Sequence, residues 1–287
     1  MKVILSRKGF DSSFGGCASP IFEDDTFVSL PIPEKSSRLR YSDIGGKQPI
    51  GSIVEDLTCG RNKSLKASDH VHLDPDLSFD ALPRKPDWRP LFGQAESAQG
   101  HLENCGVGPG DIFLFFGWFR RVEVYRGRLR FRLGAPDIHM FFGWLQVGAI
   151  WRLCEHTCQT PDWASHHPHI SAAYKKNTVY VAAKTGTTYQ AGLFRSFSDE
   201  LVLTAPGRSR SYWRLPRWFY PAQRNSVLSY HGAPSRWSFD VSYTNLKSVG
   251  RGQEFILDTT DYPEAVDWTK SLIAEHSHGR LHVSSHF

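Results

Sequence analysis

Apolar residues occur along the chain in short blocks separated by polar segments rich in Gly and Pro, a pattern typical of a β-rich protein. The most apolar block covers residues 112–119, and a second one covers 140–145. Both contain Phe-Phe-Gly-Trp, which suggests two central strands where glycine lets a backbone or a ligand come close. Chance repetition in an aromatic-rich core is the alternative, and no function is placed on the repeat. Between the blocks, residues 122–125 and 128–133 alternate around Arg126-Gly127, which predicts a hairpin.

Six further segments have the composition of strands: residues 1–6, 26–32, 178–183, 200–204, 237–243 and 254–257. A helix is predicted at 94–104. A second helix starts at Asp261, where Pro263 and Glu264 occupy the first turn ahead of an apolar stripe. Strands and helices do not alternate, which favours an α+β fold with a β-rich mixed or barrel-like sheet and few helices, one of them C-terminal.

Residues 34–91 have a weak pattern rich in Gly, Pro, Ser and charge, which predicts long loops with one ordered element around residues 70–76. We expect one domain over residues 1–287, with this stretch as a loop-rich insertion. A loop region of this length is more often functional or mobile than inert.

Composition places the chain among folded proteins, because 40% of its residues are hydrophobic and 13% aromatic. No apolar run approaches the roughly 18 to 20 residues of a membrane span, and the apolar run at the N-terminus is too short for a signal peptide. The five cysteines are scattered and odd in number, which favours reduced thiols. We therefore expect a cytoplasmic protein without a membrane partner.

The net charge of +5 suits a polyanionic partner. The excess is modest, however, and only a clustered basic face gives a strong field. Composition thus permits nucleic acid as a partner without requiring it.

The first candidate site is the loop that follows the first predicted strand. Arg7, Lys8 and Asp11 stand there with two hydroxyls and flexible backbone, a set that can bind a phosphate. Asp11 is a candidate base or metal ligand. The alternative is a solvated loop in which Asp11 caps a turn.

The second candidate is the segment His70–Asp76. If it is extended, His70, His72, Asp74 and Asp76 share one face because strand side chains alternate. Imidazole and carboxylate are ligands that Mn²⁺, Fe²⁺ and Zn²⁺ accept, so His72, Asp74 and Asp76 are the predicted metal ligands. The alternative is a polar turn, since Pro75 limits the strand.

A third candidate combines Cys154 and Cys158 with nearby histidines, namely His156, His166, His167 and His169. Their spacing lies within the range of zinc sites but lacks the usual two-residue gap between cysteines. The other interpretation of these histidines is polar loop residues, or a general acid-base group if they line a cleft.

The fourth candidate interleaves arginines with aromatic residues between positions 208 and 220. Arginines can neutralise phosphates while an indole ring stacks on an exposed base. The predicted nucleic-acid-binding residues are Arg208, Arg210, Trp213, Arg214, Arg217 and Trp218. The alternative is that the arginine stems simply cover apolar surface.

Several well-known catalytic motifs are absent from the sequence. It has no P-loop, no Gly-x-Gly-x-x-Gly that opens a helix, no Gly-x-Ser-x-Gly and no His-Glu-x-x-His. The signature of zinc base deaminases is also missing. These mechanisms are disfavoured.

The motifs around Ser6–Ser12, Ser19–Ile21, Ser29–Pro33, His72–Leu77, Phe92–Gln94 and Gly110–Phe119 resemble the bacterial family called nucleotide modification associated domain 3. The resemblance covers nearly the whole chain. It implies a role beside enzymes that modify bases in DNA or nucleotides. It therefore implies a class of partner, namely nucleic acid or a nucleotide. Other base-modification enzymes are implied as further partners. The resemblance does not imply a particular reaction.

Two hypotheses follow from these patterns. In the first, Arg7, Lys8 and Asp11 meet the histidine-aspartate segment in one cleft and act as catalytic residues together with His72 and Asp74, with a divalent metal as the candidate cofactor. In the second, the protein is a non-catalytic module that binds nucleic acid or a modified base. The two differ in whether the Asp11 and His72 side chains converge around one pocket.

Overall fold

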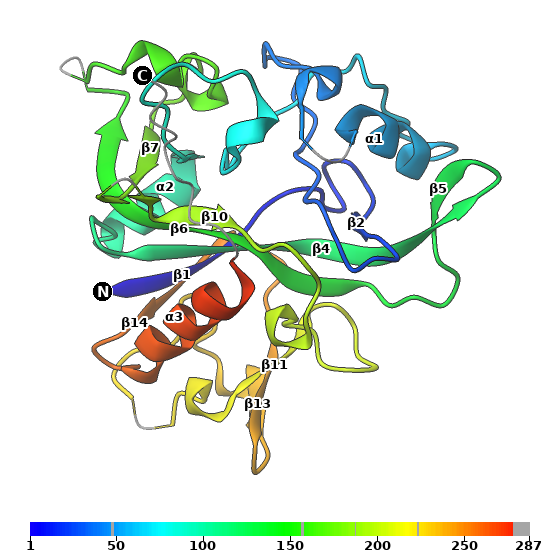
Figure 1. Cartoon of the computed structure of the whole chain (residues 1–287). Helices are drawn as coiled ribbons and strands as arrows, with labels where there is room; N and C mark the ends of the chain where they lie inside the picture. The colour runs from blue at the N-terminus through cyan, green and yellow to red at the C-terminus, as the bar shows by residue number, and fades with distance from the viewer. Residues whose placement is uncertain (47–48, 156–157, 187, 223, 278–287) are drawn as a thin grey trace.

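The fold was analysed in a computed structural model that describes residues 1–46, 49–155, 158–186, 188–222 and 224–277. A nine-stranded sheet forms its centre, with three α-helices and two smaller sheets around it (Figure 1). The sheet is mixed and open, and its last helix is C-terminal. The predicted α+β class is therefore confirmed.

The central sheet is built on the strand path β14–β1–β4–β6–β7–β3. Strand β4 is parallel to β1 and to β2, whereas the other pairs of this sheet are antiparallel. The path strands are β14 (Glu254–Asp258), β1 (Lys2–Arg7), β4 (Ile112–Tyr125), β6 (Ile138–Arg152), β7 (Asn177–Ala182) and β3 (Leu91–Ala95). Off the path, β2 (Ser19–Ile21) and β5 (Arg128–Phe131) pair with β4, and β10 (Ala191–Leu193) pairs with β6.

The remaining elements lie around this sheet. The smaller sheets are β11 (Tyr212–Pro216), β13 (Tyr243–Lys247) and β12 (Trp237–Phe239), and β8 (Lys184–Thr185) with β9 (Thr188–Tyr189). The α-helices are α1 (Ile50–Thr58), α2 (Glu96–Asn104) and α3 (Glu264–His276). Short 3-10 turns are η1 (Tyr41–Asp43), η2 (Phe79–Ala81), η3 (Asp162–Ala164), η4 (Pro168–Ile170), η5 (Asp199–Leu201), η6 (Arg217–Phe219) and η7 (Pro234–Arg236).

The two Phe-Phe-Gly-Trp tetrapeptides lie on the neighbouring strands β4 and β6, as predicted. A Cβ on Gly117 would stand 2.8 Å from the carbonyl oxygen of Lys8, and one on Gly143 would stand 2.9 Å from that of Gly192. Each glycine therefore lets another backbone approach the strand, which a side chain would prevent.

Two predicted strands were wrong. Residues 26–32 and 200–204 form isolated bridges, such as Thr26 with Ser196 and Thr204 with Trp213, and the second segment overlaps η5. Both have strand-like composition, but each forms only single bridges to its neighbours, including Met140 of β6 and Trp213 of β11 for the second segment. Local composition does not decide this pairing.

Helix α1 was not predicted within the loop-rich stretch 34–91. Its buried face, Ile53, Val54 and Leu57, packs in an apolar cluster with Tyr41 and Val71. A helix of nine residues is marginal by itself, so tertiary packing of this face accounts for its stability.

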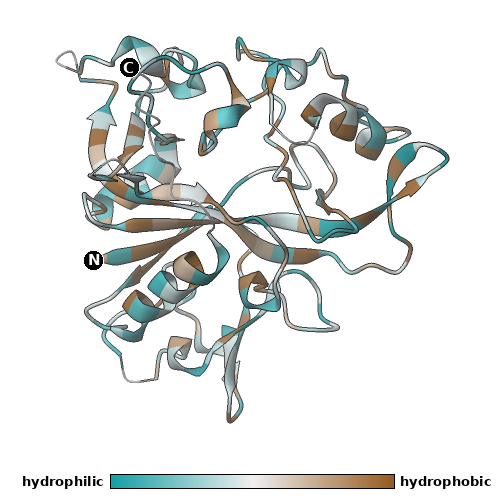
Figure 2. Cartoon of the chain, in the orientation of Figure 1, coloured by the Kyte–Doolittle hydropathy of each residue, from teal (hydrophilic) through white to brown (hydrophobic). Residues whose placement is uncertain are grey.

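Helix α3 lies on one side of the central sheet and α1 on the other (Figure 1). Apolar residues follow the central strands, and polar residues gather on loops and outer helix faces (Figure 2). None of the described helices is long and apolar enough to cross a membrane.

Candidate metal centre and adjoining cavity

Three side chains converge in the space between β3 and η4. Nε2 of His72 lies 3.7 Å from Oδ2 of Asp74, and Nε2 of His169 lies 3.8 Å from the same oxygen. One ligand atom from each of the three residues falls within 4.8 Å of the others. The two histidines come from distant parts of the chain, which the fold of η4 onto β3 brings together.

The ring of His169 is oriented by Asn177. The Asn177 amide nitrogen donates to the carbonyl oxygens of His169 at 2.8 Å and Ala172 at 3.2 Å, so its side-chain oxygen is an acceptor. That oxygen lies 2.8 Å from Nδ1 of His169, which must donate the proton. Neutral His169 therefore keeps its lone pair on Nε2, directed toward Asp74.

The ring of His72 is oriented in the same way by a carboxylate. Nδ1 of His72 forms an ion pair with Oε2 of Glu34. The other oxygen of Glu34 accepts a hydrogen bond of 3.4 Å from the hydroxyl of Tyr174. Such outer contacts fix the tautomer and the ring plane of metal-binding histidines in known sites.

Asp74 is held through its second oxygen. Oδ1 accepts from the backbone N–H of Gly93 at 2.7 Å and lies 3.2 Å from Nε2 of His167. A Cβ on Gly93 would stand 2.2 Å from the His169 ring, so only glycine fits at this position. Oδ2 of Asp74 is left facing the two Nε2 atoms.

The charges of the cluster follow from burial and from these contacts. Burial alone raises the pKa of Asp74, but hydrogen bonds from His167 and His72 outweigh it and hold that pKa well below its usual range. Burial lowers the pKa of His72, yet Asp74 and Glu34 raise it to about 9. Burial lowers the pKa of His169 to about 4, so this ring is neutral at pH 7.

His72 is protonated at pH 7, so an ion must displace its Nε2 proton on binding. The two imidazoles and one carboxylate then form a ligand set that Fe²⁺, Mn²⁺ and Zn²⁺ accept, with positions left for water or substrate. Ligand atoms at about 2.1 Å from one ion are at most about 4.2 Å apart, and the two separations from Asp74, 3.7 and 3.8 Å, fall within this limit. The side chains of His72 and Glu34 keep 12% and 24% of their surface exposed, which leaves the cluster open on that side.

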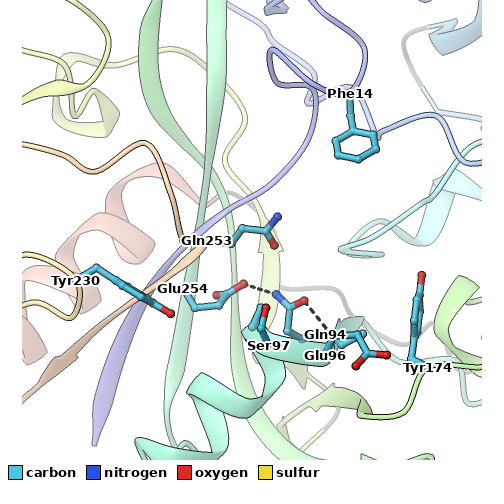
Figure 3. A pocket seen from close by; sticks show the side chains of 11 residues that line it. Phe14, Gln94, Glu96, Ser97, Tyr174, Tyr230, Gln253 and Glu254 are labelled. Atoms are coloured by element: carbon cyan, nitrogen blue, oxygen red, sulfur yellow. Dashed lines mark hydrogen bonds between the residues drawn. The ribbon is translucent and has the colours of Figure 1, made fainter.

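A cavity of about 610 Å³ lies beside the start of α2 and β14 (Figure 3). This volume lies within the range of small-molecule sites. In the view of Figure 3, Phe14 stands apart from α2, and Tyr230 and Tyr174 stand at opposite sides. The lining residues are Phe14, Gln94, Ala95, Glu96, Ser97, Ala98, Tyr174, Tyr230, Gly252, Gln253 and Glu254.

The wall of the cavity contains a buried carboxylate with one free oxygen. Oε1 of Glu254 accepts from Nζ of Lys8 at 2.9 Å and from Nε2 of Gln94 at 2.6 Å. Oε2 of Glu254 is buried and has no hydrogen-bond partner among the described residues.

The metal cluster and the cavity share a wall. Tyr174 lines the cavity and packs against His169, with ring centroids 5.5 Å apart. Gln94, another lining residue, directly follows Gly93, whose N–H binds Asp74. A molecule in the cavity would therefore lie one side chain away from the cluster.

A family model described as nucleotide modification associated domain 3 matches residues 2–258. The chain belongs to this family. Neither a curated protein nor a solved structure matches the chain significantly. The family description links the chain to nucleotide modification, and the resemblance noted from the sequence motifs is confirmed.

The predicted strand-end loop borders the cavity, but its residues have different partners. Arg7 donates to the carbonyl oxygens of Gly250 and Gly252, and Lys8 pairs with Glu254. Oδ1 of Asp11 accepts from the backbone N–H groups of Ser13 and Phe14, each at 2.7 Å, and so caps the turn. Within the described part of the chain, the residues that line the cavity do not include Arg7, Asp11, His72 or Asp74. The loop reaches the cavity through Phe14.

Asp76 lies outside the cluster. Both of its oxygens bind the guanidinium of Arg84, at 2.8 and 2.5 Å, and this pair is almost fully buried. The segment 72–75 is not an extended strand, so alternation does not place Asp76 beside Asp74.

The cysteine-histidine segment contributes in a way that its spacing did not predict. His167 and His169 belong to the cluster around Asp74, whereas His166 is exposed. Cys154 and Cys158 join no group of metal-ligating atoms among the described residues, and His156 lies outside those residues. The run of histidines at 166–169 is the signal in the sequence for a site. The sequence did not indicate that this run lies beside His72 and Asp74.

The arginine-aromatic segment lies on β11, on η6 and on the loop before β11, where Arg210 donates to the hydroxyl of Ser12 at 2.7 Å. Trp213 is fully buried and donates to His139, so it presents no ring face to a base. Trp218 is partly buried and stacks on Phe219. The guanidinium groups stack on aromatic rings: Arg208 on Tyr212, Arg210 on Trp118, Arg214 on Tyr243 and Arg217 on Phe239.

Proposed function

We propose that the protein is a metal-assisted enzyme that acts on a nucleotide or on a base of a nucleic acid. The observation that carries this proposal is the convergence of two oriented Nε2 atoms and one Asp74 oxygen beside a cavity. A divalent ion at this position would supply an activated water or polarise a substrate oxygen. Membership of a family linked to nucleotide modification supports the substrate class.

The cavity suits a flat heterocycle that has N–H groups. Enzymes that act on bases hold them by hydrogen bonds to the base edge and by stacking on aromatic rings. Gln94 lines the cavity with a side-chain amide, and Tyr230 lines it with an aromatic ring that is 49% exposed. In the proposal, Gln94 contacts the base edge and Tyr230 its face.

Each side chain of the cluster has a part in this proposal. His72, His169 and Asp74 hold the ion, and Glu34 and Asn177 keep the two rings in place. Burial raises the pKa of Tyr174, and Glu34 raises it further, so Tyr174 stays protonated at the boundary between cavity and cluster. Its hydroxyl can donate to a substrate there or to Glu34.

A second candidate function is a binding module for a modified base or for nucleic acid, without catalysis. The aromatic rings of Phe14, Tyr174 and Tyr230 around one cavity favour this alternative, since stacking on aromatic rings binds any base. It requires no metal at the His72–Asp74–His169 cluster.

Metal analysis separates the two candidates. We expect wild-type protein, purified without chelator or titrated with Mn²⁺, Fe²⁺ and Zn²⁺, to bind one ion per chain. His72→Ala, Asp74→Ala and His169→Ala should each lose it, while the exposed His166→Ala, on the same segment as His169, should keep it. Circular dichroism checks that the variants are folded. Wild type that takes up none of the three ions would leave the binding module as the better function.

A further inference from the structure

The net positive charge of the chain is concentrated in one hairpin. Residues 120–132 hold six of the 34 basic residues and one of the 29 acidic ones, Glu123, so this segment carries a charge of +5. The other 28 basic and 28 acidic residues cancel. Such a local concentration of positive charge gives a field that attracts polyanions. The modest net charge of the whole chain would not do so if it were spread evenly.

The hairpin extends beyond the central sheet. The first half of β4 is buried between β1 and β6, whereas Val122–Tyr125 at its end pair with β5 alone among the described strands. Figure 1 shows β5 and the end of β4 at the edge of the molecule, next to α1. The ribbon is therefore reachable by a large partner.

The two faces of the ribbon differ. Leu129 and Phe131 pack with Val122 on the apolar cluster that contains α1. Side chains alternate along a strand, so Arg128 and Arg130 lie on the opposite face, and Arg132 continues this order. All three are exposed, as is Arg126 at the turn. The residues of β5 alternate between polar and apolar in Figure 2.

Two arginines of the hairpin are paired with carboxylates, whereas Arg126 and Arg128 near its tip and Arg132 at its base are not. Asp25 pairs with Arg121, and Glu123 pairs with Arg130, each at 2.7 Å. Residues 126–132 contain four arginines and no carboxylate. Within the described part of the chain, Arg126, Arg128 and Arg132 have no carboxylate partner.

From this charge and shape we infer that the hairpin is a binding arm for double-stranded DNA, which contacts phosphates through Arg126, Arg128 and Arg132. Two strands about 4.8 Å apart fit the major groove of B-DNA, which is about 12 Å wide. The major groove of double-stranded RNA is too deep and narrow for side chains to read. The inference does not depend on the metal cluster or on the cavity.

The test is a salt titration of DNA binding, measured by fluorescence anisotropy with a short duplex of mixed sequence. The triple variant Arg126→Gln, Arg128→Gln, Arg132→Gln should bind more weakly than wild type. Loss of three phosphate contacts should reduce the slope of log affinity against log salt by about 2.7. The matching triple Arg→Lys variant keeps the charge and should retain most of the slope.

A matched control removes the same charge elsewhere. Arg208→Gln, Arg214→Gln, Arg217→Gln neutralises three arginines that form no salt bridge among the described residues, although the charges of Arg214 and Arg217 act on Asp240. Its slope should stay close to that of wild type. An equal or larger loss in this control, absence of duplex binding by wild type at low salt, or tighter binding to a single strand of the same sequence would overturn the inference.

Discussion

The side-chain oxygen of Asn177 accepts the Nδ1 proton of His169 over 2.8 Å, and this contact decides which nitrogen of the ring is free. Two further hydrogen bonds fix the Asn177 amide, so the assignment follows from the network itself. The free Nε2 lies beside Asp74, where Nε2 of His72 also lies. This arrangement makes the cluster a candidate metal centre rather than a collection of buried histidines.

Glu34 should act as a positioning residue for His72. Removal of its carboxylate in Glu34→Ala frees the His72 ring to rotate, and metal affinity should fall about 10- to 100-fold. Glu34→Gln keeps an acceptor for the Nδ1 proton and should restore most of the affinity. Metal titration of both variants provides the measurement, and equal affinity of Glu34→Ala and wild type would contradict the role.

Gly93→Ala should disturb the cluster through His169. The new methyl group would stand 2.2 Å from the His169 ring, so the ring or β3 must move. We expect a loss of about 1 to 3 kcal/mol in the free energy of unfolding together with loss of the metal. Gly108→Ala is the control, because a Cβ there meets no atom within 4 Å. Full metal binding by Gly93→Ala would show that the ring has room.

Asp76→Asn should keep the metal and lower stability. Both Asp76 oxygens bind Arg84, and removal of one charge from this buried pair leaves the guanidinium unpaired. A loss of about 3 to 5 kcal/mol in the free energy of unfolding is the expected order. Denaturant unfolding and metal analysis of the same sample provide the test. Loss of the metal from a folded variant would return Asp76 to the ligand set predicted from the sequence.

Tyr230→Asn should weaken the binding of nucleosides in the cavity. Loss of one stacking ring costs about 1 to 3 kcal/mol, or about 5- to 150-fold in affinity. Asparagine suits this position because the backbone of Tyr230 has a φ of 66°. Tyr243→Asn, which removes a comparably exposed ring from β13, should not change the affinity. Calorimetry with a series of nucleosides would measure both, and equal effects would exclude the cavity as the site.

Stability should fall as the pH drops from about 6.5 toward 4, because two buried histidines must stay neutral. Burial lowers the pKa of His139 to about 3 and that of His231 to about 4. Nδ1 of His139 accepts from Trp213, and Nε2 of His231 accepts from the N–H of Val249, so a proton on either atom would face another donor. The unfolded chain binds these protons below pH 6.5, whereas the folded chain does not.

At pH 5 each of these histidines should reduce the free energy of unfolding by about 2 kcal/mol relative to pH 7. Urea unfolding at the two pH values measures the change. In His231→Gln the difference between pH 7 and pH 5 should shrink by about 2 kcal/mol, even if the variant is less stable at both. An unchanged difference would contradict the assignment of His231.

The sequence by itself determined the strands and helices that depend only on residues close together in the chain. The apolar blocks at 112–119 and 140–145, the hairpin around Arg126-Gly127 and the C-terminal helix were all predicted from periodicity and turn residues, and β4, β6, β5 and α3 confirm them. The charge of the hairpin is equally local, because residues 120–132 alone carry it. His72 and Asp74 could be named because they are two residues apart.

Tertiary structure alone decided which distant residues meet. His169 joins Asp74 because η4 folds onto β3, and Lys8 pairs with Glu254 because β1 lies beside β14. Strand order and register set these contacts, and no local pattern encodes them. Burial likewise converted Trp213 from a predicted base contact into a core residue. The ligands of the candidate metal centre are therefore partly readable from the sequence, whereas its assembly is a property of the fold.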